Sequence, residues 1–239
     1  MRFPLIIVII SFCLMQQAAA NSFSPTRMHP DDRLIFTLFT DIWQNQPGNI
    51  DLKTIQRGVS IEALQDMPLG RSNFSIAAGL GLSSHNIYSD ARYLYNPADN
   101  TFDFHSLDVD YDKNKLSINY LDIPVQFRYR TRSTVRDFRF YVGIRAGYLV
   151  NAHTKYEGIQ SPGPYHIYDP EYSHMAGERK IKIKEHRLGN ISKYRIGLTA
   201  MVGYGSINFS LGFPLINVFD GNSAEDMLPL SLGVSMILF

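Results

Sequence analysis

The segment from residue 138 to residue 150 limits most strongly what this chain can fold into. Every second residue is apolar, from Phe138 to Val150, and the residues between are arginines, glycines, a tyrosine and a leucine. A period of two is typical of a β-strand with two unlike faces. Bulk water would accept any polar residue on the second face. Small residues and arginines instead suit the crowded lumen of a small closed barrel with lipid on its apolar side.

The same alternation recurs in seven other segments and predicts eight strands in all. Their expected ranges are 34–43, 55–64, 74–82, 116–129, 138–150, 193–203, 207–213 and 230–239. In the fourth, the apolar residues move from even to odd positions after Tyr120, which predicts a β-bulge within that strand. The connections are short and long in turn, and the longest loops are expected at 83–115 and 151–190.

This rhythm favours one architecture over its main alternative. Outer-membrane barrels have an even number of strands, short periplasmic turns and long external loops, which follows here if both termini face the periplasm. A secreted β-sandwich is the alternative, but it does not require alternating loop lengths. We predict an all-β chain that forms an eight-stranded antiparallel up-and-down transmembrane β-barrel in the cell outer membrane.

The N-terminal residues predict a cleaved signal peptide. Arg2 is followed by an apolar run from Leu5 to Met15 and then by three alanines that end at Ala20. The run is shorter than the roughly 20 residues that a spanning helix needs. We therefore expect a signal peptide at 1–20 and a barrel domain at 21–239. The only cysteine, Cys13, lies inside the signal, so the mature chain is expected to lack disulfides, thiol chemistry and a lipid anchor.

The expected lumen is narrow and charged. Eight strands enclose just enough space for their own inward side chains, so a general diffusion pore is not expected. Charged side chains held away from water must be paired. We predict a structural ion-pair network that plugs the lumen, with a proton path or a buried catalytic group as the alternatives. The predicted network consists of Asp41, Glu62, Asp122, Arg128, Arg145 and Arg195, and Gln126, Asn119 and Tyr141 are also expected to face inward.

Two neighbouring strands resemble a known family. Residues 120–129 read Tyr-Leu-Asp-Ile-Pro-Val-Gln-Phe-Arg-Tyr, and residues 140–148 read Phe-Tyr-Val-Gly-Ile-Arg-Ala-Gly-Tyr. They are similar to the Y-[IL]-[DE]-[IL]-P-[LV] and Y-x-G-x-x-x-G-Y strands of the PorT-like outer-membrane β-barrel family of Bacteroidetes. The resemblance implies an eight-stranded barrel in the outer membrane. From the family's best-known member it also implies a role in type IX protein secretion and gliding, with secretion-machinery proteins as partners.

The segment 177–187 predicts a strand that rises beyond the membrane with one basic edge. Lysines and isoleucines alternate along it. Cations just beyond the membrane surface would be attracted by the phosphates of lipopolysaccharide. We predict a lipopolysaccharide contact, with a merely solvated loop as the alternative. Its residues would be Arg179, Lys180, Lys182 and Lys184. The formal net charge of +1 provides no basic footprint for nucleic acid.

Catalysis needs a nucleophile within reach of an oriented base. The only such grouping is Ser83-Ser84-His85, at the outer end of the third strand. Adjacent strand residues point to opposite faces, so Ser84 and His85 are poorly placed as a pair. We predict a non-enzymatic protein, with a lipid-modifying outer-membrane enzyme that uses Ser84 and His85 as the alternative.

No metal or cofactor site is expected. The acidic loop 108–114 has the spacing of a calcium loop but lacks its turn glycine and its closing glutamate. The loop 151–190 has metal-ligand types at His166, Asp169, Glu171 and His174, but no spacing that would place them on one face.

Overall fold

The computed structural model describes most of the chain from residue 33 onward. The described residues are 33–46, 48, 50–96, 101–107, 110–131, 137–159, 180–186, 188–220 and 227–238. All of them belong to one compact unit, and the predicted signal peptide at 1–20 lies outside them. No helix among the described residues is long and apolar enough to cross a membrane.

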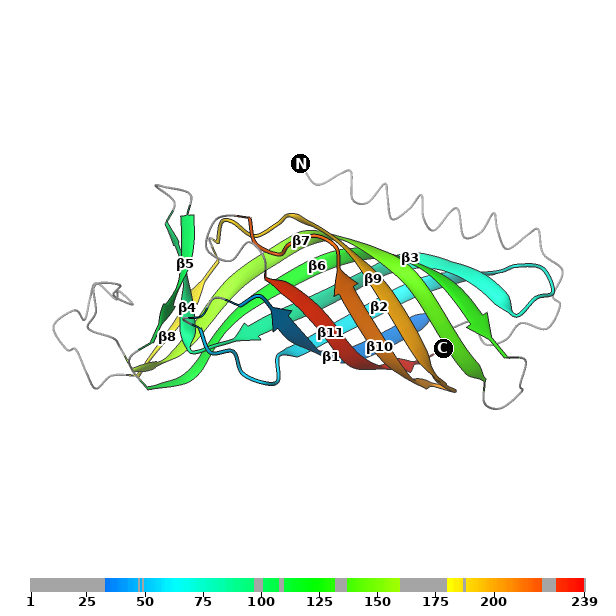
Figure 1. The fold of residues 1–239 in the computed structure, drawn as a ribbon, viewed down its shortest axis with the longest axis horizontal. Helices are drawn as coiled ribbons and strands as arrows, with labels where there is room; N and C mark the ends of the chain where they lie inside the picture. Colours follow the sequence, from blue (N-terminus) through cyan, green and yellow to red (C-terminus); the bar gives the residue numbers. More distant parts are fainter. Residues whose placement is uncertain are drawn as a thin grey trace. The chain divides into compact units, whose positions relative to one another are not determined.

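Eight strands form a closed antiparallel barrel, as predicted (Figure 1). Each strand pairs with the preceding and following barrel strands, and β1 pairs with β11 to close the wall. The barrel strands are β1 (Leu34–Gln44), β2 (Arg57–Pro68), β3 (Phe74–Tyr88), β6 (Tyr111–Arg130), β7 (Phe138–Ile159), β9 (Tyr194–Tyr204), β10 (Ile207–Pro214) and β11 (Leu228–Ile237). The sheet therefore has no free edge in the wall.

The alternation of residue types becomes an alternation of environment. In β7, Phe140 is 45% exposed on the outer face, whereas the next residue, Tyr141, is 1% exposed inside. A row of exposed apolar side chains follows the outer face of every barrel strand, which is the surface that lipid requires. On this face the rings of Tyr148 and Tyr194 lie 5.5 Å apart, near the end that carries the long loops.

The predicted bulge is present, but the extra residue lies in the neighbouring strand. Asn119 pairs with Asn151 and Tyr120 pairs with Leu149, so Val150 of β7 has no partner in β6. The prediction of a change of face within 116–129 was wrong: the even positions of β6 are buried from Asn114 to Arg128. Asn119, predicted to face inward, is on the opposite face from the buried Tyr120.

The two longest predicted loops contain further strands. β3, β6 and β7 continue beyond the wall, and β8 (Lys180–Glu185) pairs with the end of β7. This confirms the strand predicted within 177–187. A hairpin of β4 (Ala91–Asn96) and β5 (Thr101–Ser106) lies at the same end (Figure 1). The long stretches predicted as loops at 83–115 and 151–190 are thus partly sheet, because their polar composition hid a continuing strand pattern.

A cluster of aromatic rings covers the outer end of the lumen. We call it the aromatic cap, and its rings belong to Trp43, Tyr93, Phe102, Phe104 and Phe219. They pack on inward-facing apolar residues of β3 and β6. This contact explains why β6 becomes apolar on its inner face toward the outer end: there it faces the cap and no longer the charged lumen.

Candidate functional site in the barrel lumen

Paired charges fill much of the lumen, most of them between two apolar layers. The aromatic cap closes the outer end, and a second apolar layer lies near the short turns. The second layer contains one residue from each of six strands, namely Ile35, Leu64, Ala77, Tyr141, Met201 and Ile237. Inward-facing positions supply every charged group between them, as the period of two dictates.

The outer charged layer is built around Arg195 of β9. Its Nε lies 3.0 Å from Oδ1 of Asp122, and its NH2 lies 2.5 Å from Oδ2. This two-bond arrangement is the strongest geometry available to an arginine and a carboxylate. NH2 also donates to Ser83 Oγ at 2.6 Å, and the guanidinium stacks 4.5 Å above the ring of Tyr120.

His85 joins Arg195 to Asp41 across the same layer. Nδ1 of His85 lies 2.8 Å from Oδ2 of Asp41, and Nε2 lies 2.5 Å from NH1 of Arg195. An arginine can only donate, so Nε2 is the acceptor and the ring hydrogen sits on Nδ1, facing the carboxylate. Ser231 Oγ donates to the other oxygen of Asp41 at 2.5 Å. Both ring nitrogens of His85 are therefore engaged.

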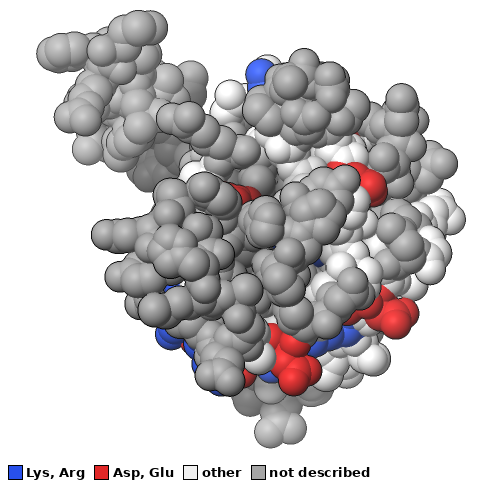
Figure 2. All heavy atoms as spheres, turned by 90° about the vertical axis from the view of Figure 1, so that its left-hand side faces the viewer, with Lys and Arg blue, Asp and Glu red and all other residues white. Residues whose placement is uncertain are grey.

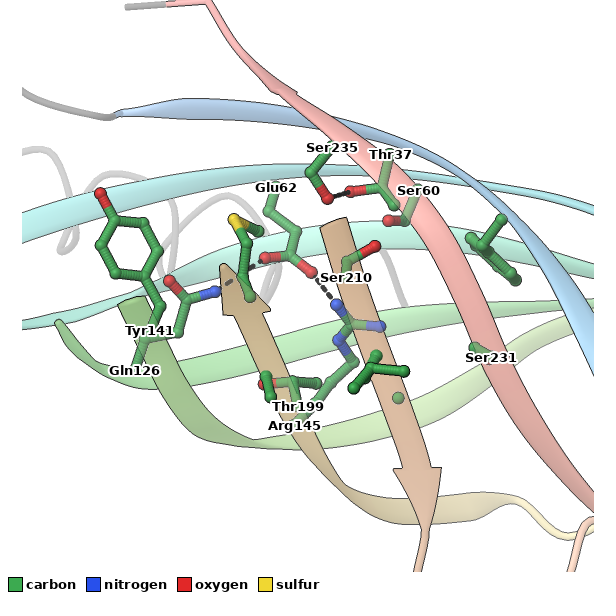
Figure 3. A pocket seen from close by; sticks show the side chains of 15 residues that line it. Thr37, Ser60, Glu62, Gln126, Tyr141, Arg145, Thr199, Ser210, Ser231 and Ser235 are labelled. Carbon is green, nitrogen blue, oxygen red and sulfur yellow. Dashed lines mark hydrogen bonds and ion pairs between the residues drawn. The ribbon is translucent and has the colours of Figure 1, made fainter. Parts of the chain in front are cut away.

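The inner charged layer is built around Glu62 of β2. Its carboxylate forms an ion pair with Arg145 and accepts from Gln126 Nε2 at 3.3 Å. Beside this pair lies a cavity of about 40 Å³, most of whose lining residues have polar side chains, shown in Figure 3. The same figure shows Thr37 and Ser235 joined across the top of the cavity, with their hydroxyls 2.7 Å apart.

A third group of charges continues toward the short turns. Gln126 Oε1 accepts from Nε and NH2 of Arg128 at 3.0 and 2.9 Å. The Arg128 guanidinium lies 4.8 Å above the ring of Tyr141 and 3.6 Å from Asp66 Oδ1. Asp66 also pairs with Arg130. Gln126 therefore joins the inner charged layer to this third group of charges.

The structure places all the residues of the predicted network inside the lumen. It brings Glu62 to Arg145 and Asp122 to Arg195 as direct pairs. Arg128 is paired with Asp66, and Asp41 with His85, so two partners came from outside the predicted set. Both lie beyond the expected ends of their strands, and extending the alternation of β2 and β3 would have found them.

Ser84 and His85, the pair that the alternative enzyme would use, do not come together as a nucleophile and a base. His85 faces the lumen and is 6% exposed, whereas Ser84 lies on the opposite face of β3. The serines near this layer are Ser83, bonded to Arg195, and Ser231, bonded to Asp41. Neither hydroxyl is bonded to the ring of His85.

The basic strand β8 is partly neutralised by its neighbours. Lys180 lies 2.9 Å from Asp112, and Lys182 lies 2.7 Å from Glu157. Lys184 pairs in register with Lys155, another lysine. Arg179, the fourth residue of the predicted contact, lies outside the described residues.

A cationic cluster forms where β6, β7 and β8 run side by side. Burial and the charges of Lys113, Lys155 and Lys184 lower the pKa of Lys115. Burial, together with Lys184, Lys115 and His186, also lowers the pKa of His153. Mutual repulsion of this kind makes a bound anion favourable at this position.

In the described part of the chain, no three His, Cys, Asp or Glu side chains gather as metal ligands would. Asp112 of the acidic loop is paired with Lys180, and Asp108 lies outside the described residues. The candidates in the second long loop, His166, Asp169, Glu171 and His174, also lie outside them.

A closed eight-stranded barrel with an apolar outer face and a lumen of paired charges is an outer-membrane β-barrel protein. Comparison with family models agrees with this class. Residues 32–220 match the outer membrane protein beta-barrel domain, and the chain belongs to that family. Its location is therefore the outer membrane. The search of curated proteins found no match.

Proposed function

We propose that this protein is a non-enzymatic outer-membrane barrel that serves as an accessory of type IX protein secretion. The filled lumen argues against transport, and the engagement of both His85 nitrogens by Asp41 and Arg195 supports the non-enzymatic part. Two apolar layers and the paired charges leave cavities of only about 40 and 60 Å³ among the described residues, too small for a transported solute. Such a barrel acts through its surfaces. These are the loops, the periplasmic turns and the external sheet, by which we mean the outer ends of β6 and β7 together with β8.

The secretion role is supported by the resemblance to the PorT-like family of Bacteroidetes. The two strands that carry it are β6 and β7, which pair with each other along their length. Two of their motif residues, Asp122 and Tyr141, help to build the lumen. The motif therefore describes how this type of barrel is packed, and the role in secretion rests on the family alone.

A deletion strain tests the secretion role. Type IX cargo should disappear from the culture medium and accumulate in the periplasm, and the intact gene should restore export. Lipoproteins and other barrels should remain in the outer membrane of the deletion strain, as a control for general envelope damage. Normal cargo export would overturn the secretion role and leave the barrel assignment unchanged.

A lipid-modifying enzyme is the rival function. The engagement of both His85 nitrogens by Asp41 and Arg195 argues against it, because a general base needs a free nitrogen facing its nucleophile. Outer membranes from cells with and without the protein should give the same lipid A species by mass spectrometry. A species that depends on the protein, and that disappears in Ser84→Ala, would establish the enzyme instead.

We also propose that the external sheet contacts lipopolysaccharide phosphates. The supporting feature is the cluster of Lys115, Lys155 and Lys184, whose positive charges lie close enough to affect one another. Figure 2 views this end and shows basic and acidic side chains along its lower edge.

Charge-removing variants test this contact. Lys155→Gln with Lys184→Gln should weaken lipopolysaccharide binding and its dependence on salt. Lys180→Gln is the matched control, since that lysine already has Asp112 as its partner. Equal binding by the unmodified protein, the double variant and the Lys180→Gln control would overturn the proposed lipopolysaccharide contact.

A further inference from the structure

The barrel wall has a seam between β10 and β11 at its outer end. These strands pair from Ile207–Met236 only as far as Gly212–Ser231. Beyond that point β10 still pairs with β9, and β11 still pairs with β1. Figure 1 shows the two strands diverging toward the long-loop end.

Local sequence explains why the pairing stops. Extending the register would place Pro214 opposite Pro229, and a proline has no N–H to donate to a ladder. The chain after β10 then follows the start of β9 and the residues before it. Leu215 N bonds to Ile196 O, and Ser192 N bonds to Val218 O. The seam is thus held open by backbone pairing with β9 on one side and by the pairing of β11 with β1 on the other.

A pocket of about 60 Å³ lies at this seam. Phe213, Pro214 and Pro229 line its wall side, and the buried Trp43, His85 and Tyr120 line its inner side. Phe213 is 45% exposed on the lipid-facing surface. The pocket therefore reaches from the lipid side of the wall toward the outer charged layer, directly beneath the aromatic cap.

The inner part of the pocket offers hydrogen-bond donors beside arginines that are already paired with carboxylates. Its ionisable lining residues are His85, Tyr120, Arg145 and Arg195; the carboxylates paired with the two arginines, Asp122 and Glu62, do not line it. Trp43 Nε1 and Tyr120 Oη are buried, and neither has a hydrogen-bond partner among the described residues. Two such donors without acceptors cost free energy, which a ligand oxygen would recover.

We infer that the seam binds a long-chain fatty acid from the outer leaflet. Its carboxylate accepts from Trp43 Nε1 and Tyr120 Oη beside the Arg195 guanidinium, and its chain leaves between β10 and β11 into the lipid. The pocket holds a small head and a few carbon atoms, so a bulky phospholipid or glycolipid head is excluded by size. This inference does not depend on the secretion role.

A photoactivatable palmitic acid, with a diazirine in its chain, tests the site on the folded barrel in lipid vesicles. Mass spectrometry should find the label in 213–218 and 228–230. Unlabelled palmitate should displace it, whereas lysophospholipid should not. Label spread evenly over the apolar belt, for example at Leu82 and Ile144, would overturn the inference. Displacement by lysophospholipid alone would overturn it in favour of a phospholipid site.

Donor variants provide the second arm of the test. Trp43→Phe with Tyr120→Phe keeps the rings and removes both donors, so labelling at the seam should fall by at least about tenfold, as expected for lost bonds to a charged group. Tyr141→Phe, a buried tyrosine that lines the other cavity, is the matched control and should label normally. If the double variant does not fold, Trp43→Phe and Tyr120→Phe are labelled separately. Undiminished labelling in the folded variants would overturn the inference.

Discussion

Gly147 of β7 stands directly against Asp122 of β6, its partner in the barrel wall. A Cβ atom at Gly147 would lie 2.5 Å from Oδ1 of Asp122 and 2.7 Å from Nε of Arg195. The absence of a side chain at this position is what allows the carboxylate and the guanidinium to meet. A glycine in the wall is thus part of the outer charged layer.

Gly147→Ala should therefore destabilise the barrel by about 1–3 kcal/mol, the usual cost of overpacking a filled interior. The midpoint of urea unfolding, followed by the gel shift of the folded barrel, measures it. Gly212→Ala is the control, because its Cβ would come no closer than 3.3 Å to Ser231 Cβ. Equal midpoints for the two variants would show that the ion pair can move aside freely.

The Glu62–Arg145 pair makes a second prediction about the lumen. Glu62→Ala leaves Arg145 without its carboxylate inside the barrel, and breaking a buried pair costs about 3–5 kcal/mol. Replacing both residues, as Glu62→Gln with Arg145→Met, should recover most of this loss because no uncompensated charge remains. Urea unfolding of both variants distinguishes them. A double variant as unstable as the single one would mean that the pair itself, and not charge balance, stabilises the lumen.

Weakening the aromatic cap should loosen the β4–β5 hairpin without unfolding the barrel. Phe219 is 1% exposed and contacts four other rings of the cap, so Phe219→Ala should cost about 3–5 kcal/mol of local packing. Limited proteolysis should then cut the β4–β5 hairpin faster, while the boiled-gel shift of the barrel stays unchanged. Phe209→Ala, on the lipid face, is the control. Unaltered cleavage of the hairpin would contradict a role for the cap in holding it.

The sequence predicted the barrel because lipid on one side and a narrow lumen on the other impose the same period on all eight strands. Periodicity at 138–150 therefore identified the outward face correctly, from Phe138 to Val150. It failed beyond the membrane, where both faces of a strand can be polar. Strand ends were also placed too early within the wall, at 64 in β2 and 82 in β3, so Asp66 and His85 were missed as lumen partners.

The cap and the seam were harder to predict for another reason. Tyr93-Leu94-Tyr95 and Phe102-Asp103-Phe104 carry a short alternation that could have revealed the hairpin. Their packing on Trp43 and Phe219, however, joins segments far apart in the chain, and a single sequence contains no signal for such contacts. The seam depends on prolines 214 and 229 being opposite each other, which requires the register of β10 and β11.

The external sheet should lose stability as the medium becomes acidic. The pKa of His153 is lowered in the folded protein, by burial first and then by Lys184, Lys115 and His186. The unfolded segment therefore binds more protons than the folded one once the pH falls to about 6.5, the ordinary histidine value, and stability decreases from there down to the folded pKa. Hydrogen exchange of 154–159 and 180–185 should speed up from about pH 8 to about pH 5, after correction for intrinsic rates.

His153→Gln should flatten this pH dependence, because glutamine does not titrate. His105→Gln is the control, since His105 lies in β5 next to Asp103 and is not among the groups that lower the pKa of His153. Added lipopolysaccharide should reduce the acid effect in the intact protein, because a bound phosphate favours the protonated ring. An unchanged slope in His153→Gln would assign the acid sensitivity to another group of the external sheet.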